Sequence, residues 1–377
     1  MLESDKVALL VCSGARLCTP LPARGPKFAM AQVNQQTIAD KLRISRTSVS
    51  RSFSNHPAIN PETRAKVFAM AARLGYRYSV RRPAAHTQGT ARDTVGVLIA
   101  LPQNRGGGVA ETFQSMLGGI SERLRSSERP LDVRYFDPAG GEEAVTTRSL
   151  RDIHGRKWTG AVLIYSFPPA IISSLAQRLP CVSLVEDYAD QGVDCIDIDQ
   201  TGAMHRLMRR LADLGHRRFG FLSWPYSVPT PWVQKRCAAF LESVLRLGLP
   251  FQPDTLINVR PGEHLSVEES AALVATHVRR GVTAWVCAAD HQAYGLLHHL
   301  RHLQVRVPQD CSITGFDGIP PPPEMPQLTT IKVPYWDMGG AAVSRLLNRI
   351  EHPSAPRRHI LIAGQPIFGD TIGAPLI

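Results

Sequence analysis

The sequence predicts two kinds of folded unit in one chain: a small all-α block near the N-terminus, then an α/β core of two lobes with doubly wound parallel sheets. Between residues 33 and 76, short amphipathic helical patterns follow one another. From residue 94, short apolar runs alternate with longer amphipathic ones, and unbroken apolar strands are typical of parallel sheets covered on both faces. A chain of 377 residues is long enough for two or three domains, so we expect the core to form two lobes with a cleft between them.

Start and stop signals place three helices in the N-terminal block. Asn34 can cap the first helix, and Ser45 can cap a second over residues 46–53. Asn60, which is followed by a proline, marks the start of a third helix. That helix should end at Gly75.

The core elements follow in order. The expected strands lie at residues 95–101, 161–165, 181–185, 219–222, 284–288 and 312–316. The expected helices lie at residues 112–125, 200–214, 233–247, 267–280 and 293–303.

Positive charge is concentrated in one short segment. Residues 30–93 contain 11 Lys and Arg against 3 Asp and Glu, a net charge of +8, whereas residues 94–377 contain 28 and 27, a net charge of +1. A basic block attached to a nearly neutral core is typical of a polyanion-binding module joined to a domain with another role.

Other kinds of site find little support in the sequence. The seven cysteines include no CxxC pair, which favours reduced thiols in a cytoplasmic protein. No apolar run approaches the ~18 residues of a membrane span, so we expect no membrane association. Phosphate-loop, nucleophile-elbow and HExxH motifs do not occur, and we expect no catalytic residues, no metal and no cofactor.

The second helix has an apolar back and a polar front. Val49 and Phe53 are four residues apart and should face inward, whereas Thr47 and Arg51 share another face. Such a helix fits the DNA major groove, where a guanidinium can pair with both acceptors of guanine. The spacing predicts a helix-turn-helix, although a solvated face on any small helical bundle would share it.

Four short motifs follow one another in this block, and their order and spacing match a known pattern without insertions or deletions. They are residues 37–39 (TIA), 44–51 (ISRTSVSR), 61–67 (PETRAKV) and 74–76 (LGY). Together they resemble the DNA-binding headpiece of the LacI/GalR family of transcription regulators. The sequence departs from the family at Arg43, which stands where a turn glycine is usual.

The resemblance implies which headpiece residues touch DNA. The base-reading positions are Arg46, Thr47 and Arg51. The positions that lie against phosphates are Asn34, Ser45, Ser50 and Ser54.

The linker after the headpiece departs from the family, in which a hinge helix inserts a leucine into the minor groove. Here the corresponding residue is Ala85, which is too small to wedge a base step, and Pro83 is tolerated only in the first turn of a helix. We therefore expect no leucine-lever hinge. Arg81 and Arg82 either lie along a narrow minor groove or belong to a plain basic linker.

The resemblance continues through the core. Residues 197–202, 211–222 (LADLGHRRFGFL), 305–317 (VRVPQDCSITGFD) and 328–331 (LTTI) are similar to successive passages of the family. It implies a periplasmic-binding-protein-like core, a homodimer, and a small effector held between the lobes.

Three effector-binding residues also follow from the resemblance: Arg236, Asp290 and Asp317. A guanidinium and carboxylates suit polyhydroxylated ligands, because each can form paired hydrogen bonds to adjacent hydroxyls. Ala289 stands where the family has an asparagine, and this difference argues against one common type of sugar ligand. Alternatively, Arg236 pairs with one of the two carboxylates as a structural ion, and Trp232 either stacks on a ligand or packs in the core.

These observations predict four segments. They are residues 1–32, a disordered extension or an incorrectly assigned start; 33–78, the headpiece; 79–93, a hinge or linker; and 94–377, the effector-binding and dimerisation core. The predicted function is a sequence-specific transcriptional regulator, a repressor, whose affinity for double-stranded operator DNA is modulated by a sugar or sugar derivative. The alternative is a cytoplasmic sugar-binding or sugar-converting protein with an appended DNA-binding segment.

Overall fold

The computed structural model describes residues 34–53, 94–100, 108–136, 158–226, 230–260 and 262–376, with 58, 59, 63, 66, 67, 70, 71, 74 and 76–79. Predicted residues Ser54, Arg81, Arg82, Pro83 and Ala85 lie outside this set, as does the segment 1–32. No helix in the described part of the chain is long and apolar enough to cross a membrane.

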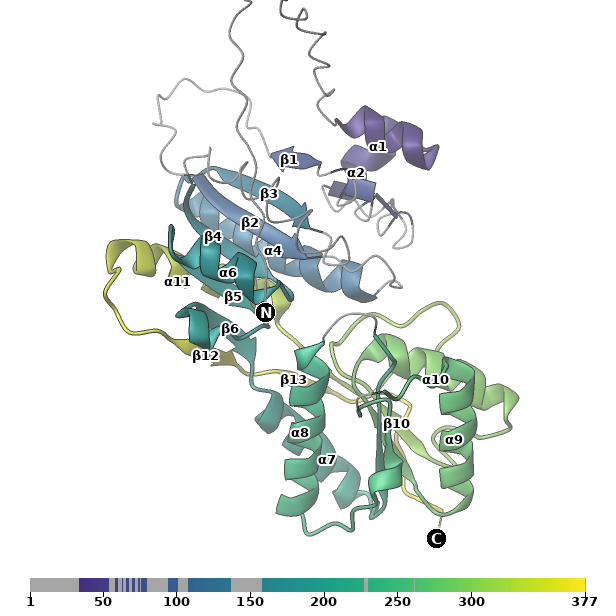
Figure 1. Cartoon of the computed structure of the whole chain (residues 1–377). Coiled ribbons are helices and arrows are strands. Elements are labelled where there is room, and N and C mark those ends of the chain that lie inside the picture. The colour runs from purple at the N-terminus through teal and green to yellow at the C-terminus, as the bar shows by residue number, and fades with distance from the viewer. Residues whose placement is uncertain are drawn as a thin grey trace, which may run out of the picture. The chain divides into compact units, whose positions relative to one another are not determined.

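The two headpiece helices form where the caps predict them, α1 over Gln35–Leu42 and α2 over Arg46–Phe53 (Figure 1). The Asn34 side chain accepts a hydrogen bond from the backbone N–H of Thr37 at 2.9 Å. The Ser45 hydroxyl accepts one from the backbone N–H of Ser48 at 3.0 Å. Arg43 ends α1 in the left-handed region with φ 54°, the conformation for which a glycine would be usual.

The first lobe is built on a seven-stranded sheet in the order β1-β3-β2-β4-β5-β6-β12. Its strands are β1 (Arg77–Ser79), β2 (Thr94–Ala100), β3 (Leu131–Phe136), β4 (Trp158–Ile164), β5 (Cys181–Leu184), β6 (Asp194–Ile198) and β12 (His359–Ile362). Its helices are α4 (Gly108–Ser126), α6 (Pro169–Ala176) and α11 (Tyr335–Glu351), with a short 3-10 turn at Ala189–Gln191. All neighbouring strands pair in parallel except β1, which is antiparallel to β3.

Helices cover both faces of this sheet. Successive side chains on a strand point to opposite faces, so neighbouring residues of β2 pack against different helices. Val97 and Ile99 of β2 belong to the core cluster that includes α4 and α11, whereas Leu98 packs with α6. A β-carbon on Gly339 of α11 would lie 2.1 Å from the backbone oxygen of Met116, so this close contact with α4 requires glycine.

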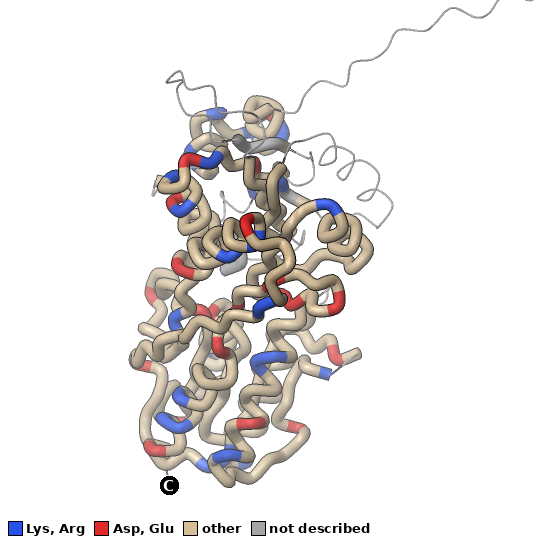
Figure 2. The backbone as a smooth tube through the Cα atoms, turned by 90° about the vertical axis from the view of Figure 1, so that its left-hand side faces the viewer, with Lys and Arg blue, Asp and Glu red and all other residues tan. Residues whose placement is uncertain are grey.

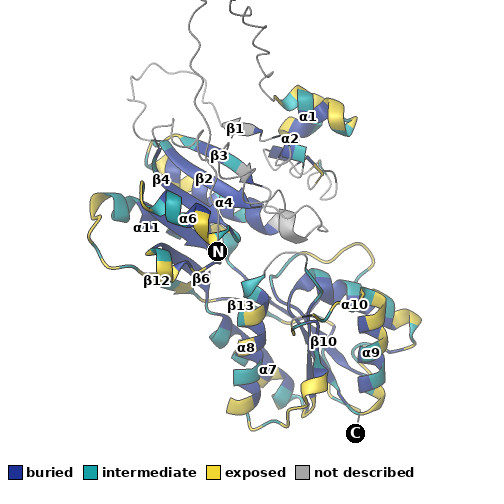
Figure 3. Cartoon of the chain, viewed as in Figure 1, coloured by how far each residue is buried: buried dark blue, intermediate teal, exposed yellow. Residues whose placement is uncertain are grey.

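The second lobe repeats the arrangement around a four-stranded parallel sheet in the order β10-β9-β7-β8. Its strands are β7 (Phe219–Leu222), β8 (Leu256–Ile257), β9 (Ala284–Cys287) and β10 (Ser312–Thr314). Its helices are α7 (Gln200–Asp213), α8 (Pro231–Arg246), α9 (Val267–Arg279) and α10 (Asp290–His302), with a 3-10 turn at Pro253–Thr255. In both lobes the central strands are buried and the helices expose their outer faces, whereas the edge strand β12 is partly exposed (Figure 3).

The chain passes between the lobes at three places: from β6 to α7, from β11 (Thr330–Lys332) to α11, and from β12 to β13 (Gln365–Ile367). Strands β11 and β13 form a separate antiparallel pair. Lys, Arg, Asp and Glu are interspersed along the core (Figure 2).

The predicted fold class is confirmed: two doubly wound parallel sheets in a two-lobed core, with short helices before it. Seven of the described strands were not predicted, namely β1, β3, β6, β8, β11, β12 and β13. Strand β1 lies across the predicted boundary at residue 78 and pairs with β3 at the edge of the core sheet. The described cysteines, at positions 181, 195, 237, 287 and 311, are free and buried, as expected.

Candidate functional site

The front of α2 carries the predicted base-reading residues. Arg46, Thr47 and Arg51 are exposed, and so is Ser50 beside them. On the opposite face Val49 is fully buried, so packing fixes which side of α2 points outward.

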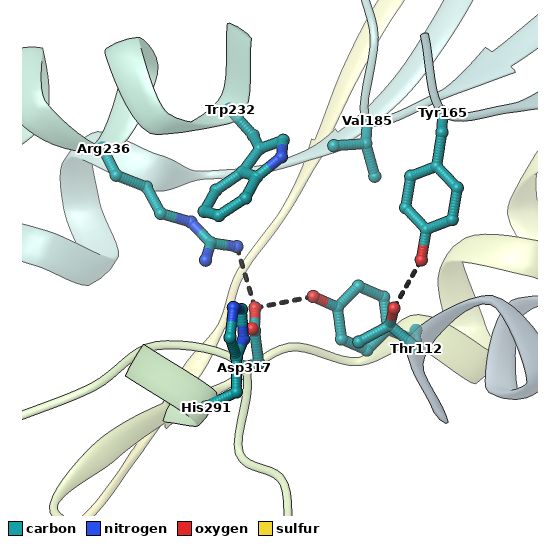
Figure 4. A pocket seen from close by; sticks show the side chains of 8 residues that line it. Thr112, Tyr165, Val185, Trp232, Arg236, His291 and Asp317 are labelled. Atoms are coloured by element: carbon teal, nitrogen blue, oxygen red, sulfur yellow. Dashed lines mark hydrogen bonds and ion pairs between the residues drawn. The ribbon is translucent and has the colours of Figure 1, made fainter. Parts of the chain in front are cut away.

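A pocket lies between the two lobes, lined by Thr112, Tyr165, Val185, Trp232, Arg236, His291, Asp317 and Tyr335 (Figure 4). Its volume is about 60 Å³. Tyr165 and Val185 directly follow strands β4 and β5, and Asp317 lies just beyond β10. Ligand sites of open α/β sheets occur at such carboxyl ends of strands.

Arg236, on α8, contributes a buried guanidinium to this pocket. Its Nη2 donates to Asp317 Oδ1 at 2.9 Å, its Nη1 donates to the carbonyl of Ala288 at 2.6 Å, and its Nε donates to Gln200 at 3.2 Å. The guanidinium carbon lies 4.0 Å from the ring centre of Phe316 and 4.9 Å from that of Trp232. The side chain is therefore held rigidly, by three acceptors and two aromatic rings.

The Asp317 carboxylate joins the two lobes. Its Oδ1 accepts a second hydrogen bond, at 2.8 Å, from the hydroxyl of Tyr335 at the start of α11. Burial, followed by the nearby charge of Asp317, raises the pKa of Tyr335, so this phenol stays protonated. On the other wall, the hydroxyls of Thr112 and Tyr165 are hydrogen-bonded to each other (Figure 4).

Three of the lining residues have backbone conformations that are rarely adopted by residues other than glycine. Tyr165 has φ 69°, Val185 has φ 72° and Asp317 has φ 134°. Each such residue costs on the order of 1–3 kcal/mol, and residues of this kind concentrate at binding and catalytic sites. The strain therefore marks the same pocket as the polar side chains do.

Asp290, the third predicted effector residue, is fully buried and does not line the pocket. Its Oδ2 accepts from the backbone N–H groups of Gly318 and Ile319 at 2.7 and 2.9 Å, and its Oδ1 accepts from the Thr330 hydroxyl at 2.5 Å. The carboxyl group thus fixes the turn that follows Asp317. Burial raises its pKa to about 7.

A second ion pair crosses between the lobes beside the pocket. Lys235 of α8 donates to Asp197 of β6 at 2.7 Å and to the carbonyl of Val185 at 2.8 Å. The next residue of α8, Arg236, faces the pocket and pairs with Asp317, so successive residues of α8 bind carboxylates of different lobes.

Sequence reasoning missed Thr112, Tyr165, Val185, His291 and Tyr335 as lining residues. Two of them could have been found, because Tyr165 and Val185 end predicted apolar strands and binding residues commonly follow such strands. The others come from helix termini whose place beside the pocket depends on tertiary packing.

The two lobes, the pocket between them and the capped helices before them define a class of protein: a two-lobed binding core attached to a helix-turn-helix. The family model of the periplasmic binding protein-like domain matches residues 208–372. The chain is 28% identical to the HTH-type transcriptional regulator MalR of Streptomyces coelicolor, over 90% of this chain and 96% of that one.

Two solved structures have the same fold. One is the LacI family transcriptional regulator CCPA from Weissella paramesenteroides with bound sucrose (TM-score 0.61, 21% identity, 74% of this chain and 99% of that one). The other is the lac repressor dimer bound to operator and the anti-inducer ONPF (TM-score 0.61, 19% identity, 91% and 99%). The predicted resemblance to the LacI/GalR family of helix-turn-helix transcription regulators is confirmed by these comparisons.

Proposed function

We propose that this regulator is a cytoplasmic repressor that binds double-stranded operator DNA as a homodimer and reads it with α2. The observation that carries the proposal is the exposed Arg46, Thr47 and Arg51 opposite a fully buried Val49. Arginine pairs with two acceptors of guanine in the major groove, while hydroxyls beside it reach phosphates. The predicted phosphate-binding residues Asn34, Ser45, Ser50 and Ser54 complete this interface.

The effector in this proposal is a small hydroxyl-rich molecule held between the lobes by Arg236 and Asp317. One protein of the same fold, CCPA from Weissella paramesenteroides, was solved with sucrose and with glucose, which supports a sugar-like ligand. Asp290 supports the site indirectly, since its carboxyl group holds the turn at Gly318 that orients Asp317.

Sites beyond the described residues remain part of the proposal. Arg81 and Arg82 contact the minor groove or serve as a basic linker between the headpiece and the core. The headpiece would then span residues 33–78, the linker 79–93 and the core 94–377, with β1 attaching the end of the headpiece segment to the core sheet.

The test begins by selecting operator sequences from a random DNA library with the full chain. Fluorescence anisotropy then measures affinity for the selected and for a scrambled duplex. We expect specific binding about 10³-fold or more tighter than non-specific binding, and a change in affinity upon adding one of sucrose, glucose, cellobiose or ribose. Equal affinity for both duplexes would contradict the repressor function. If NMR showed that the protein consumes one of the sugars, that result would instead favour the sugar-converting alternative.

A further inference from the structure

The guanidinium and the carboxylate that line the pocket neutralise each other, and the imidazole Nε2 of His291 lies 3.1 Å from the hydroxyl of Tyr226. Of the eight lining residues, Arg236 supplies the one guanidinium and Asp317 the one carboxylate, and they form an ion pair at 2.9 Å. Their side chains are 5% and 11% exposed, so water screens the pair only weakly.

The positive charge has little capacity left for an anionic ligand. All three nitrogens of Arg236 already donate hydrogen bonds, and Trp232 and Phe316 lie over the guanidinium. Lys235, whose acceptor Val185 lines the pocket, directs its ammonium to Asp197 and to the carbonyl of Val185. Arg236 has five N–H donors and Lys235 has three, but each cation is already paired with a carboxylate, so a phosphate would have to compete with Asp317 or Asp197 for the positive charge.

The negative charge favours ligands that donate hydrogen bonds. Arg236 and Tyr335 both donate to Oδ1 of the Asp317 carboxylate, and its other oxygen can accept further donors. Sugar hydroxyls supply such donors, whereas a phosphate dianion supplies none and is repelled. Tyr165, Thr112 and Tyr335 add neutral hydroxyls that can both donate and accept.

We propose that the pocket selects an uncharged, hydroxyl-rich effector and rejects the phosphorylated or carboxylated form of the same molecule. The selection rests on the proposed effector function and comes from the internal neutralisation of Arg236 by Asp317. An anion in this site would lose its hydration without gaining a counter-charge, a cost that neutral hydroxyls do not pay.

The experiment uses the full chain on its selected operator and two ligand pools. One pool contains glucose, ribose, sucrose and cellobiose; the other contains phosphate monoesters of the same four sugars. A small-molecule extract of bacteria, separated on an anion exchanger into a neutral and an anionic fraction, provides a second pair of samples. Operator affinity and the melting temperature of the protein are measured with each sample.

We expect the neutral pool or the neutral fraction to change both quantities, with apparent affinity about 100-fold or more above that of the phosphorylated or anionic counterpart. A response to the anionic samples that equals or exceeds the neutral one overturns the proposal. If no sample changes operator affinity, the effector function itself fails, and the selectivity falls with it.

A pair of variants separates pocket charge from total charge. Asp317→Asn leaves Arg236 without its counter-charge, and we expect affinity for the phosphate-ester pool to rise about tenfold or more. Asp310→Asn is the matched control, because it breaks the exposed ion pair with Arg306 (2.6 Å) and makes the same change in net charge away from the pocket. Unchanged phosphate affinity in a folded Asp317→Asn protein would overturn the proposal, and the comparison of pools on the unmodified chain decides it if that variant does not fold.

Discussion

Replacing Arg236 with methionine should destabilise the core and abolish the response to effector. Methionine keeps much of the side-chain volume between Trp232 and Phe316 but leaves Asp317 without its buried counter-charge. Breaking a buried ion pair costs about 3–5 kcal/mol. Because Asp317 is 11% exposed and keeps its hydrogen bond from Tyr335, we expect the lower end, about 3 kcal/mol.

Urea denaturation followed by circular dichroism measures this loss, and a melting temperature lower by about 10 °C would agree with it. Operator affinity without effector should change by no more than about twofold, because the hydrogen bonds of Arg236 all lie within the core. The double variant with Asp317→Asn removes the stranded charge, and its loss of stability should be smaller than the sum of the two single losses by about 1–3 kcal/mol.

Three results would refute this reasoning. A loss of stability below about 1 kcal/mol would mean that the ion pair contributes no more than an exposed one does. Additive effects of the two substitutions, within about 0.5 kcal/mol, would mean that Arg236 stabilises the core through its other contacts. A variant that melts and also loses operator binding would make Arg236 a purely structural residue.

Three further predictions concern other parts of the chain. Asp290, whose pKa burial raises to about 7, takes up a proton in the folded state that the unfolded chain releases near its ordinary 3.8. Stability should therefore fall as the pH rises from about 4 to about 7, and urea titrations across that range should show Asp290→Asn lacking this slope. Arg51→Ala should lose about 1–3 kcal/mol of specific operator binding while weak, salt-sensitive binding to random DNA remains, and equal losses on both duplexes would reject base reading. Pro83→Arg combined with Ala85→Leu should tighten operator binding and increase DNA bending in a gel-shift phasing assay, whereas a strong bend with the unmodified chain would contradict the expectation of no leucine lever.

Local signals explain what could be predicted from the sequence. The caps at Asn34 and Ser45 and the buried face of α2 depend on residues within one helical turn, so spacing alone located them. Most buried strands could be recognised in the sequence as apolar runs. Helix α11 was not predicted, because Gly339 lowers its helical propensity. That glycine is explained only by the close approach of α4.

The site was harder to predict, because its geometry depends on tertiary contacts. The resemblance located Arg236 and Asp317, and the structure pairs them, which the alternative of a buried ion pair anticipated. Nothing in the spacing of Asp290 indicated that its carboxyl group accepts from the backbone of Gly318 and Ile319. The hydrogen bond between Thr112 and Tyr165 joins residues 53 positions apart, and no periodic pattern connects them.

Side-chain contacts between the lobes constrain how an effector can act on DNA binding. Tyr335 of the first lobe donates to Asp317 of the second, and Lys235 of the second donates to Asp197 and to the carbonyl of Val185 in the first. A ligand shifts an equilibrium only by binding its states differently. An effector that donates to the other oxygen of Asp317 adds a donor to the carboxylate that Tyr335 already contacts, whereas Lys235 and Asp197 stay paired. The orientation of α11 relative to the second lobe, which depends on Tyr335, is therefore the feature through which an occupied pocket can differ from an empty one.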